Sequence, residues 1–335
     1  MIRPQLAASR DGSVAGPNSA DATTTAAAAA LADNLRVTRP AVSVILMRRR
    51  VDTSVLAEAL RSGMREVVEE RVEKWGRIGI ALTAVAVLLH LAALVTRGLG
   101  SDPVRVPWGN MYEFSLAGAF GVGATYLLLA RRYSLRWMGL PVTGFQVVVL
   151  MLAVLLLYEP AGPLVPALHS YWLVIHVAAA VIASGAFAVG AIASALFLVK
   201  DRAVRRGTLR PGGYLDRLPT TVDLDRVAYR LHAFGFPVWT FAALVAGPIW
   251  AEYAWGRYWN WDPKEVWAFI TWVVYAAYLH ARATAGWRGK AAAVIALVGF
   301  ATLLFNFVGI NFFFGSGSQH SYAAPEPTAV VRSLE

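Results

Sequence analysis

The sequence predicts an all-α protein that crosses a membrane several times, and two observations carry this prediction. Only 16% of the 335 residues are charged, whereas a soluble domain needs about 25% charged residues to cover its surface. The apolar residues, 57% of the chain, also come in blocks of about twenty, the helix length that crosses a hydrocarbon core of roughly 30 Å. Both observations exclude a chain that is exposed to water throughout its length.

The apolar blocks predict a polytopic membrane helix bundle with about seven transmembrane helices, or six to eight, because boundaries read from sequence are uncertain by a few residues. The expected spans are residues 76–96, 111–130, 138–158, 171–199, 233–250, 265–281 and 291–311.

Residues 1–74 differ in composition from the rest of the chain. Up to about residue 42 they are rich in Ala, Thr, Ser and Gly, which predicts a disordered tail, and Met47 and Met64 are alternative starts. The stretch Ser54–Trp75 carries alternating charge, which predicts a solvated or membrane-surface helix. The expected domains are a cytoplasmic tail (1–74), a transmembrane domain (75–325) and an external C-terminal tail (326–335).

The basic residues predict the orientation in the membrane. The connections after the second, fourth and sixth spans hold fourteen Lys and Arg residues, whereas the opposite connections and the C-terminal tail hold five. The positive-inside rule therefore places the N-terminus in the cytoplasm and the C-terminus outside, in a multi-pass protein of the cytoplasmic (inner) membrane. The net charge of +10 does not indicate nucleic acid, because the basic residues lie between apolar blocks and not on one amphipathic surface.

The absence of cysteine limits the chemistry of the chain. It forms no disulfide, offers no thiolate ligand and does no thiol chemistry itself. Any metal or haem iron must be held by His, Met, Tyr or carboxylate side chains.

Tryptophan is concentrated in one connection, residues 250–267, which the topology places outside. Six of the twelve tryptophans lie between Trp250 and Trp272. Trp and Tyr favour the membrane interface, but an interfacial belt alone rarely gathers so many aromatic residues in one connection. We therefore favour a platform for a large planar ligand. Trp255 and Trp259 are spaced i, i+4 and would share a face if that stretch is helical.

The sixth span begins with a strong helix-start signal. Asp262 is expected to be the N-cap, with Pro263 at the first helical position and Glu265 at the third. The positive end of the helix dipole then faces the platform, where it favours an anionic group. Haem, a planar macrocycle with two propionates, suits this combination.

The same residues resemble a known family. The tryptophan-rich motif comprises Trp255-Gly256, Trp259, Trp261-Asp262-Pro263-Lys264-Glu265, Trp267 and Tyr278-Leu279-His280-Ala281-Arg282. It resembles the motif of the haem-handling superfamily, and within it the CcsA/ResC branch (often called CcsB in actinobacteria) of the system II cytochrome c biogenesis machinery. Further matching residues, in the family's order, are Trp108–Glu113, Ser170–Val177, Gly309–Asn311 and His320–Tyr322.

The histidines are the expected iron ligands, since neutral imidazole is the usual axial ligand of haem. His176 and His320 share the outer side with the tryptophan segment by the topology, and the resemblance implies that they are the axial ligands of an external haem b, bound as a substrate. It also implies that His280 is the transmembrane ligand of an inner haem, whose second ligand comes from a partner protein. The expected platform residues are Trp255, Trp259, Trp261, Asp262 and Trp267.

Other polar residues are weaker candidates. His169 stands two helical turns before His176 and could rival it, whereas His90 and His232 are expected in packing or interfacial roles. Residues at the outer start of the second span either line the external site or serve as a helix cap and an interfacial aromatic. These residues are Asn110, Tyr112 and Glu113.

We therefore expect a haem transport and positioning subunit of a cytochrome c synthase (haem lyase), which presents haem on the outer face for thioether attachment to apocytochrome c. The resemblance implies a ResB-like membrane partner, and whether the chain is catalytic at all stays open, although it is not expected to be catalytic alone. Thiol-reducing proteins would act separately on the apocytochrome. The alternatives are a haem exporter or chaperone, a membrane electron-carrier cytochrome and a solute transporter.

Overall fold

The computed structural model describes residues 53–132, 135–161, 168, 170–314, 318 and 320. The predictions for residues 1–52, His169 and the C-terminal tail 326–335 lie outside the described residues. The chain divides into two compact units, Met1–Glu73 and Lys74–Glu335, and the following paragraphs concern the second unit. Every regular element in the described part of the chain is a helix, which confirms the all-α prediction.

Long helices make up the unit and follow the predicted spans. Their order is α3 (Thr53–Leu99, which begins in the first unit), α4 (Met111–Arg132), α5 (Gly139–Leu156), α6 (Tyr171–Arg205), α8 (Thr221–Phe241), α10 (Pro263–Thr284) and α11 (Lys290–Leu304). The short elements are η1 (Leu135–Met138), α7 (Tyr214–Arg217), η3 (Ala242–Ala246), α9 (Gly247–Trp255), η4 (Phe305–Gly309) and α12 (Ile310–Phe313). The predicted surface helix Ser54–Trp75 is helical, but it continues without a break into the first span as α3.

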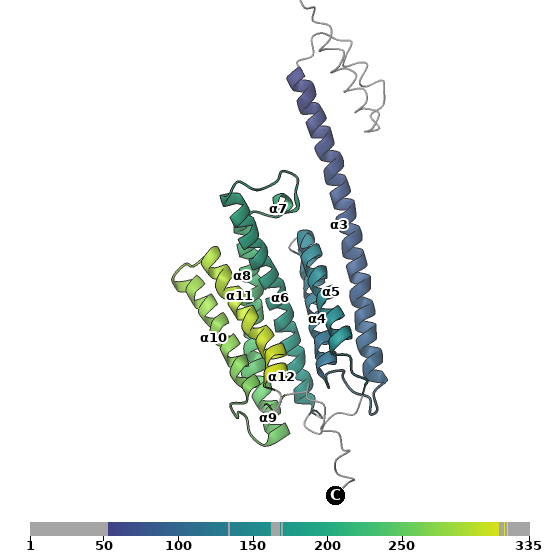
Figure 1. Cartoon of the computed structure of the whole chain (residues 1–335), viewed down its shortest axis with the longest axis vertical. Helices are drawn as coiled ribbons and strands as arrows, with labels where there is room; N and C mark the ends of the chain where they lie inside the picture. The colour runs from purple at the N-terminus through teal and green to yellow at the C-terminus, as the bar shows by residue number, and fades with distance from the viewer. Residues whose placement is uncertain are drawn as a thin grey trace, which may run out of the picture. The chain divides into compact units, whose positions relative to one another are not determined.

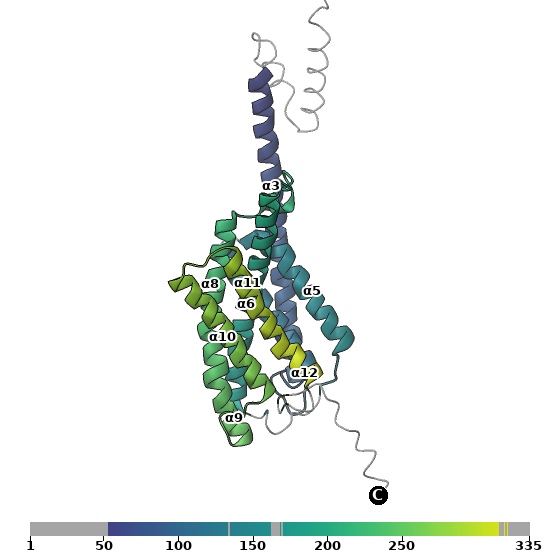
Figure 2. The ribbon, with the colours of Figure 1, turned by 60° about the vertical axis from the view of Figure 1, so that its left-hand side comes forward.

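Six of the helical segments within the described ranges are long and apolar enough to cross a membrane. The helix α10 is not among these six segments, and its sequence contains charged residues as well as Trp and Tyr. Its 22 residues nevertheless extend about 33 Å at 1.5 Å per residue, which matches the hydrocarbon core. Figures 1 and 2 both draw α10 alongside α8 and α11.

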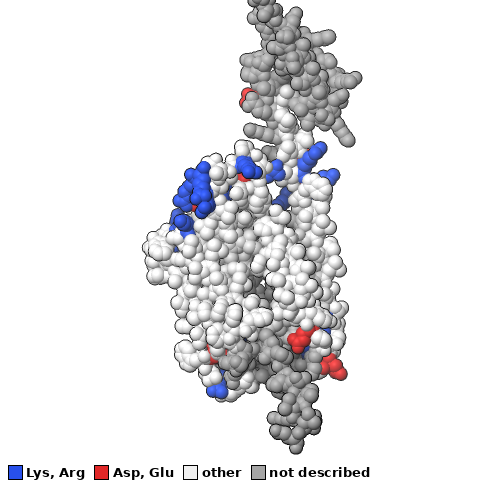
Figure 3. Space-filling view, viewed as in Figure 1, with Lys and Arg blue, Asp and Glu red and all other residues white. Residues whose placement is uncertain are grey.

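The two ends of the bundle differ in charge. The α6–α8 and α10–α11 connections lie at one end, where Lys and Arg side chains gather, and Asp and Glu appear at the opposite end (Figure 3). We call these the basic end and the tryptophan end, since the connection between α9 and α10 lies at the latter (Figure 1). The separation of charge agrees with the asymmetry expected of a membrane protein.

The helix α6 packs at the centre of the bundle, against α4, α8 and α11. Small residues let its neighbours approach closely, as is common between membrane helices. A Cβ atom at Gly185 would lie 2.5 Å from the Gly121 carbonyl oxygen of α4. A Cβ atom at Gly190 would lie 2.6 Å from Cε1 of His232 on α8. The central helix thus fixes where α4 and α8 stand, and with them the walls of the site.

Candidate ligand-binding site

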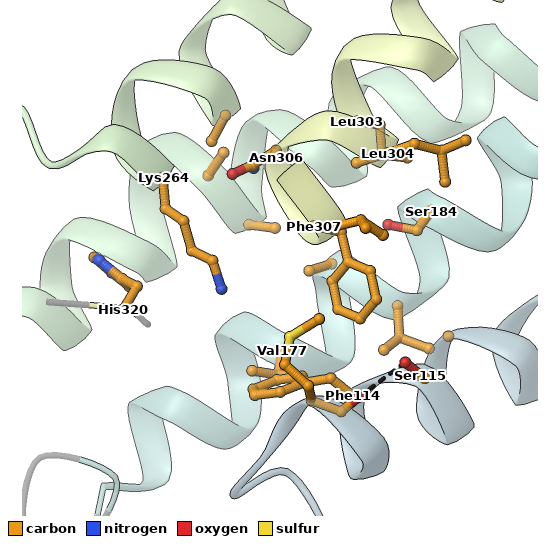
Figure 4. A pocket seen from close by; sticks show the side chains of 18 of the residues that line it. Phe114, Ser115, Val177, Ser184, Lys264, Leu303, Leu304, Asn306, Phe307 and His320 are labelled. Atoms are coloured by element: carbon orange, nitrogen blue, oxygen red, sulfur yellow. Dashed lines mark hydrogen bonds between the residues drawn. The ribbon is translucent and has the colours of Figure 1, made fainter. Parts of the chain in front are cut away.

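A cavity of about 430 Å³ extends from the tryptophan end into the bundle between α4, α5, α6, α10, α11 and η4. Its volume lies within the range of about 300–1,000 Å³ that is typical of ligand pockets. Most of the lining side chains are apolar, such as Phe114, Val177 and Phe307 (Figure 4). The polar groups are few and include His176, Lys264 and His320. An apolar cavity with a few convergent polar groups is the usual form of a binding site.

His176 reaches the cavity from α6. Its Nδ1 lies 2.9 Å from the carbonyl oxygen of Ala242, the first residue of the π-helical turn η3. Because the π-helical turn is wider, the Ala242 carbonyl accepts its backbone hydrogen bond from the N–H of Gly247. π-Helical turns are frequent at functional sites. The imidazole also stacks on Trp250, with ring centroids 5.9 Å apart and an interplanar angle of 12°.

His320 follows α12 in the chain and is bound to the start of α10. Its Nδ1 lies 3.0 Å from Oδ1 of Asp262, and the hydroxyl of Ser318 donates to the same oxygen over 2.7 Å. The indoles of Trp250 and Trp255 pack edge-on against the imidazole, with centroid distances of 5.4 and 4.6 Å. His176 and His320 therefore contact the same indole, that of Trp250.

Asp262 is the N-cap of α10, and the predicted capping box is confirmed. Its side chain accepts the backbone N–H of Lys264, while Glu265 accepts the backbone N–H of Asp262. Burial by itself raises the pKa of Asp262, but the hydrogen bonds from His320, Ser318 and the Lys264 backbone outweigh it and lower the pKa to about 2. Asp262 is thus a carboxylate at neutral pH.

The tryptophans of the segment take separate places and meet edge to face. The helix α9 ends at Trp255, where Gly256 adopts a left-handed conformation with φ of 71°. The stretch from Trp255 to Trp259 is therefore not helical, so the condition under which the two side chains would share a face is not met. Trp259 lines the cavity, whereas Trp267 packs against Phe305 of η4, with ring centroids 4.2 Å apart.

Trp261 points outward and has a strained backbone. Its φ of 58° is unusual for a residue other than glycine, and 71% of its surface is exposed. The backbone N–H groups of Asn260 and Asp262 both donate to Oε2 of Glu265, so the residues on either side hold Trp261 in this conformation. It meets Trp259 edge-on at 5.9 Å.

Lys264 is the cation of the cavity wall. It lies in the first turn of α10, and Figure 4 shows its side chain extending from the helix start into the cavity, on the same side as His320. From the sequence, Lys264 is recognised as part of the tryptophan-rich motif and not as a cavity residue. Its place in the first turn, between the N-cap and Glu265, does not reveal which way it points, because that depends on how α10 packs.

The residues at the start of α4 have other contacts. Asn110 caps the helix by accepting the N–H of Glu113, which confirms the capping role. The Glu113 carboxylate is fully buried and binds Arg97 and Arg105, each at 2.7 Å, and the Gly109 N–H at 2.6 Å. Tyr112 packs against Tyr158 and beneath Arg97. Their neighbours Met111, Phe114 and Ser115 line the cavity.

The other histidines in the described ranges lie apart from the cavity. His280 has an exposed side chain near the basic end of α10. His232 is fully buried among Phe187, Tyr275 and Tyr278. His90 meets Phe120 edge-on at 5.9 Å.

Two further features of the site are absent from the sequence prediction. Trp250 contacts both cavity histidines, although its place in the tryptophan segment was the only signal for it. The Ala242 carbonyl binds His176, and a backbone acceptor cannot be predicted from a pattern of side chains. Neither role can be predicted from the sequence, because each comes from contacts with distant parts of the chain.

The comparisons with known proteins identify the family of the chain. The family described as cytochrome C assembly protein matches residues 108–316. This range contains every described cavity residue except His320. The chain belongs to the CcsA family of cytochrome c biogenesis proteins. The predicted family resemblance is thereby confirmed.

Relatives named cytochrome c biogenesis protein CcsA share about a third of their residues with this chain. The protein from Synechococcus sp. (strain JA-3-3Ab) is 34% identical over 75% of this chain and 87% of its own length. The one from Gloeobacter violaceus is 32% identical over 75% and 88%. The one from Porphyra purpurea is 35% identical over 64% and 78%. Together with the six apolar helices, these relatives indicate a multi-pass membrane protein.

Proposed function

We propose that this CcsA-family chain binds haem in the cavity at the tryptophan end and presents it for covalent thioether attachment to apocytochrome c. The observation that carries the proposal is that two imidazoles, from distant parts of the chain, line one apolar cavity. Each uses Nδ1 for a hydrogen bond, which leaves Nε2 as the nitrogen of each ring that can bind a metal. Imidazole nitrogens in this state are the usual axial ligands of haem iron.

The donor set favours haem over a bare metal ion. No group of three or more His, Asp or Glu side chains in the described ranges could hold a metal ion. A zinc or similar site needs at least three protein ligands, whereas haem brings four equatorial nitrogens of its own and needs one or two ligands from the protein. The apolar walls suit the macrocycle, and haem b is the substrate that we propose.

Lys264 supplies the charge that a haem propionate requires. A carboxylate in an apolar cavity must be paired with a cation or hydrogen-bond donors, and the Lys264 side chain extends into the space beside His320 (Figure 4). The start of α10 adds the positive end of its dipole. The aromatic side chains of Trp250, Trp255 and Trp259 surround the same region.

The exposed position of His280 supports the proposed inner haem. A ligand that shares a haem with another protein must face out of its own bundle, and the His280 side chain is exposed near the basic end of α10. The partner would be a ResB-like membrane protein that supplies the second ligand. In the topology that we propose, the basic end lies in the cytoplasm, so haem enters near His280 and is presented at the opposite face.

In this proposal the main role of the chain is to position haem, and it does not itself supply a reacting group. It contains no cysteine, so separate thiol-reducing proteins must keep the apocytochrome cysteines reduced. Holding the vinyl groups of haem next to those thiols would accelerate attachment through proximity and orientation. The alternatives remain a haem exporter or chaperone that does not take part in attachment, or an electron-carrier cytochrome.

Absorption spectroscopy of the purified protein, with and without its membrane partner, tests the proposal. We expect a low-spin bis-histidine spectrum in the wild type that is weakened by His176→Ala and by His320→Ala and restored by added imidazole. His90→Ala, remote from the cavity, should leave it unchanged. Covalent haem on a co-expressed apocytochrome separates attachment from simple export. A wild type without haem under every expression condition would refute haem binding.

A further inference from the structure

The two cavity histidines are held in the same tautomer. A backbone carbonyl can only accept hydrogen bonds, and Oδ1 of Asp262 already accepts the N–H of Lys264 and the hydroxyl of Ser318. In both the His176–Ala242 and the His320–Asp262 pair, therefore, Nδ1 carries the proton and donates it. In the neutral imidazole this arrangement leaves the lone pair on Nε2, the nitrogen available to a metal.

The acceptors of the two histidines differ in charge. The carbonyl of Ala242 is neutral, and it also accepts the N–H of Gly247. The carboxylate of Asp262 is negative, and its side chain is only 2% exposed. A buried negative acceptor draws the Nδ1 proton toward itself, which increases the electron density and the basicity of Nε2. The two ligands are therefore chemically unequal.

We propose that Asp262 is the positioning residue of His320 and makes it the more strongly electron-donating of the two axial imidazoles. The inference rests on the proposed function, because it assigns unequal roles to the two histidines of one haem site. Asp262 and His320 lie 58 residues apart in the sequence. The same oxygen that caps α10 thus binds both Ser318 and His320 and sets the tautomer of that histidine.

A stronger axial donor stabilises ferric haem relative to ferrous haem, so Asp262 should lower the midpoint potential of the bound haem. The hydrogen bond itself should exist without haem, because both partners belong to the protein. These two consequences can be measured separately. One is a tautomer in the haem-free protein, and the other is a potential in the haem-loaded protein.

The tautomer is measured by ¹⁵N NMR of the full-length, haem-free protein labelled at histidine in detergent, with His320→Gln to assign the signal. We expect His320 to be protonated at Nδ1 in the wild type and in Ser318→Ala. In Asp262→Ala we expect a mixture of tautomers. An unchanged Nδ1-protonated signal in Asp262→Ala would overturn the proposal.

The potential is measured by spectroelectrochemistry of the haem-loaded protein. Asp262→Asn is the informative variant, because asparagine is as good an N-cap as aspartate and the start of α10 is preserved while the negative charge is removed. We expect a higher midpoint potential than in the wild type and a smaller change in Ser318→Ala. Equal potentials in the wild type and Asp262→Asn would overturn the proposal. A wild type that binds no haem refutes the proposed function, and the tautomer then still decides the Asp262–His320 pairing.

Discussion

At the scale of single residues, the protein combines an apolar cavity with a few charged side chains, and the carboxylates of Asp262 and Glu113 each have defined hydrogen-bond partners. Asp262 is held by three donors, and Glu113 is held by two guanidinium groups and a backbone N–H. Lys264 extends into the cavity itself. We therefore expect different effects from replacing the two side chains: Lys264 should affect ligand binding, and Glu113 should affect the stability of the fold.

Replacing Lys264 should weaken haem binding through the propionate. A hydrogen bond to a charged group contributes about 1.5–3 kcal/mol, so Lys264→Gln should lower the affinity at least tenfold, whereas Lys264→Arg should retain most of it. The measurement is titration of haem-free protein with haem. Haem dimethyl ester, which lacks free carboxylates, is the control ligand, and equal losses for both ligands would contradict propionate recognition by Lys264.

Replacing Glu113 should instead destabilise the fold. The Glu113 side chain is fully buried between Arg97 and Arg105, and breaking a buried ion pair costs about 3–5 kcal/mol. Glu113→Gln should therefore lower the thermal unfolding temperature in detergent. Glu159→Gln is the matched control, because Arg97 binds the carbonyl of Glu159 and its side chain is exposed. A normal unfolding temperature combined with lost haem binding would place Glu113 in the site.

At the scale of the helices, close packing and π-helical turns shape the cavity. The turn η3 presents the Ala242 carbonyl to His176, and a second π-helical turn, η4, places Phe307 on the cavity wall. The positions of both turns depend on how closely α6 packs against its neighbours. The glycine contacts between α4 and α6 should therefore be sensitive to single methyl groups.

Gly185→Ala should force α4 and α6 apart. The new Cβ would lie 2.5 Å from a backbone oxygen, that of Gly121, and 2.7 Å from Oγ1 of Thr125, and overpacking of this kind costs typically about 1–3 kcal/mol. Thermal unfolding followed by circular dichroism measures the loss. Gly79→Ala on α3, where nothing lies within 4 Å of the new Cβ, should be neutral or slightly stabilising. Equal unfolding temperatures for the two variants would show that α4 and α6 can separate without cost.

At the scale of the whole molecule, the separation of charge in Figure 3 predicts how the chain lies in the membrane. The native chain has no cysteine, so single cysteines report topology without a background. Arg257→Cys at the tryptophan end should react with a membrane-impermeant maleimide in intact cells. Arg288→Cys at the basic end should react only after permeabilisation. Both positions are exposed, and the reverse pattern would invert the proposed topology.

Much of the fold was predictable because it depends on local composition. Apolar blocks of membrane length gave the long helices, and the Asp262-Pro263-Lys264-Glu265 run gave the start of α10, since a capping box involves only neighbouring residues. The spacing of Trp255 and Trp259 predicted a shared face only for a helical stretch, and Gly256 ends α9 between them. A left-handed glycine is a local signal, and it could have been weighed against the spacing.

The sequence by itself determined the membrane class, the helices, the capping box and the resemblance to the family, because all of these follow from composition or from neighbouring residues. Only the tertiary structure decided which groups meet at the cavity: Asp262 with His320, the Ala242 carbonyl with His176, and Trp250 with both histidines. These contacts join residues that are far apart in the chain. Their geometry is set by helix packing, which no local pattern encodes.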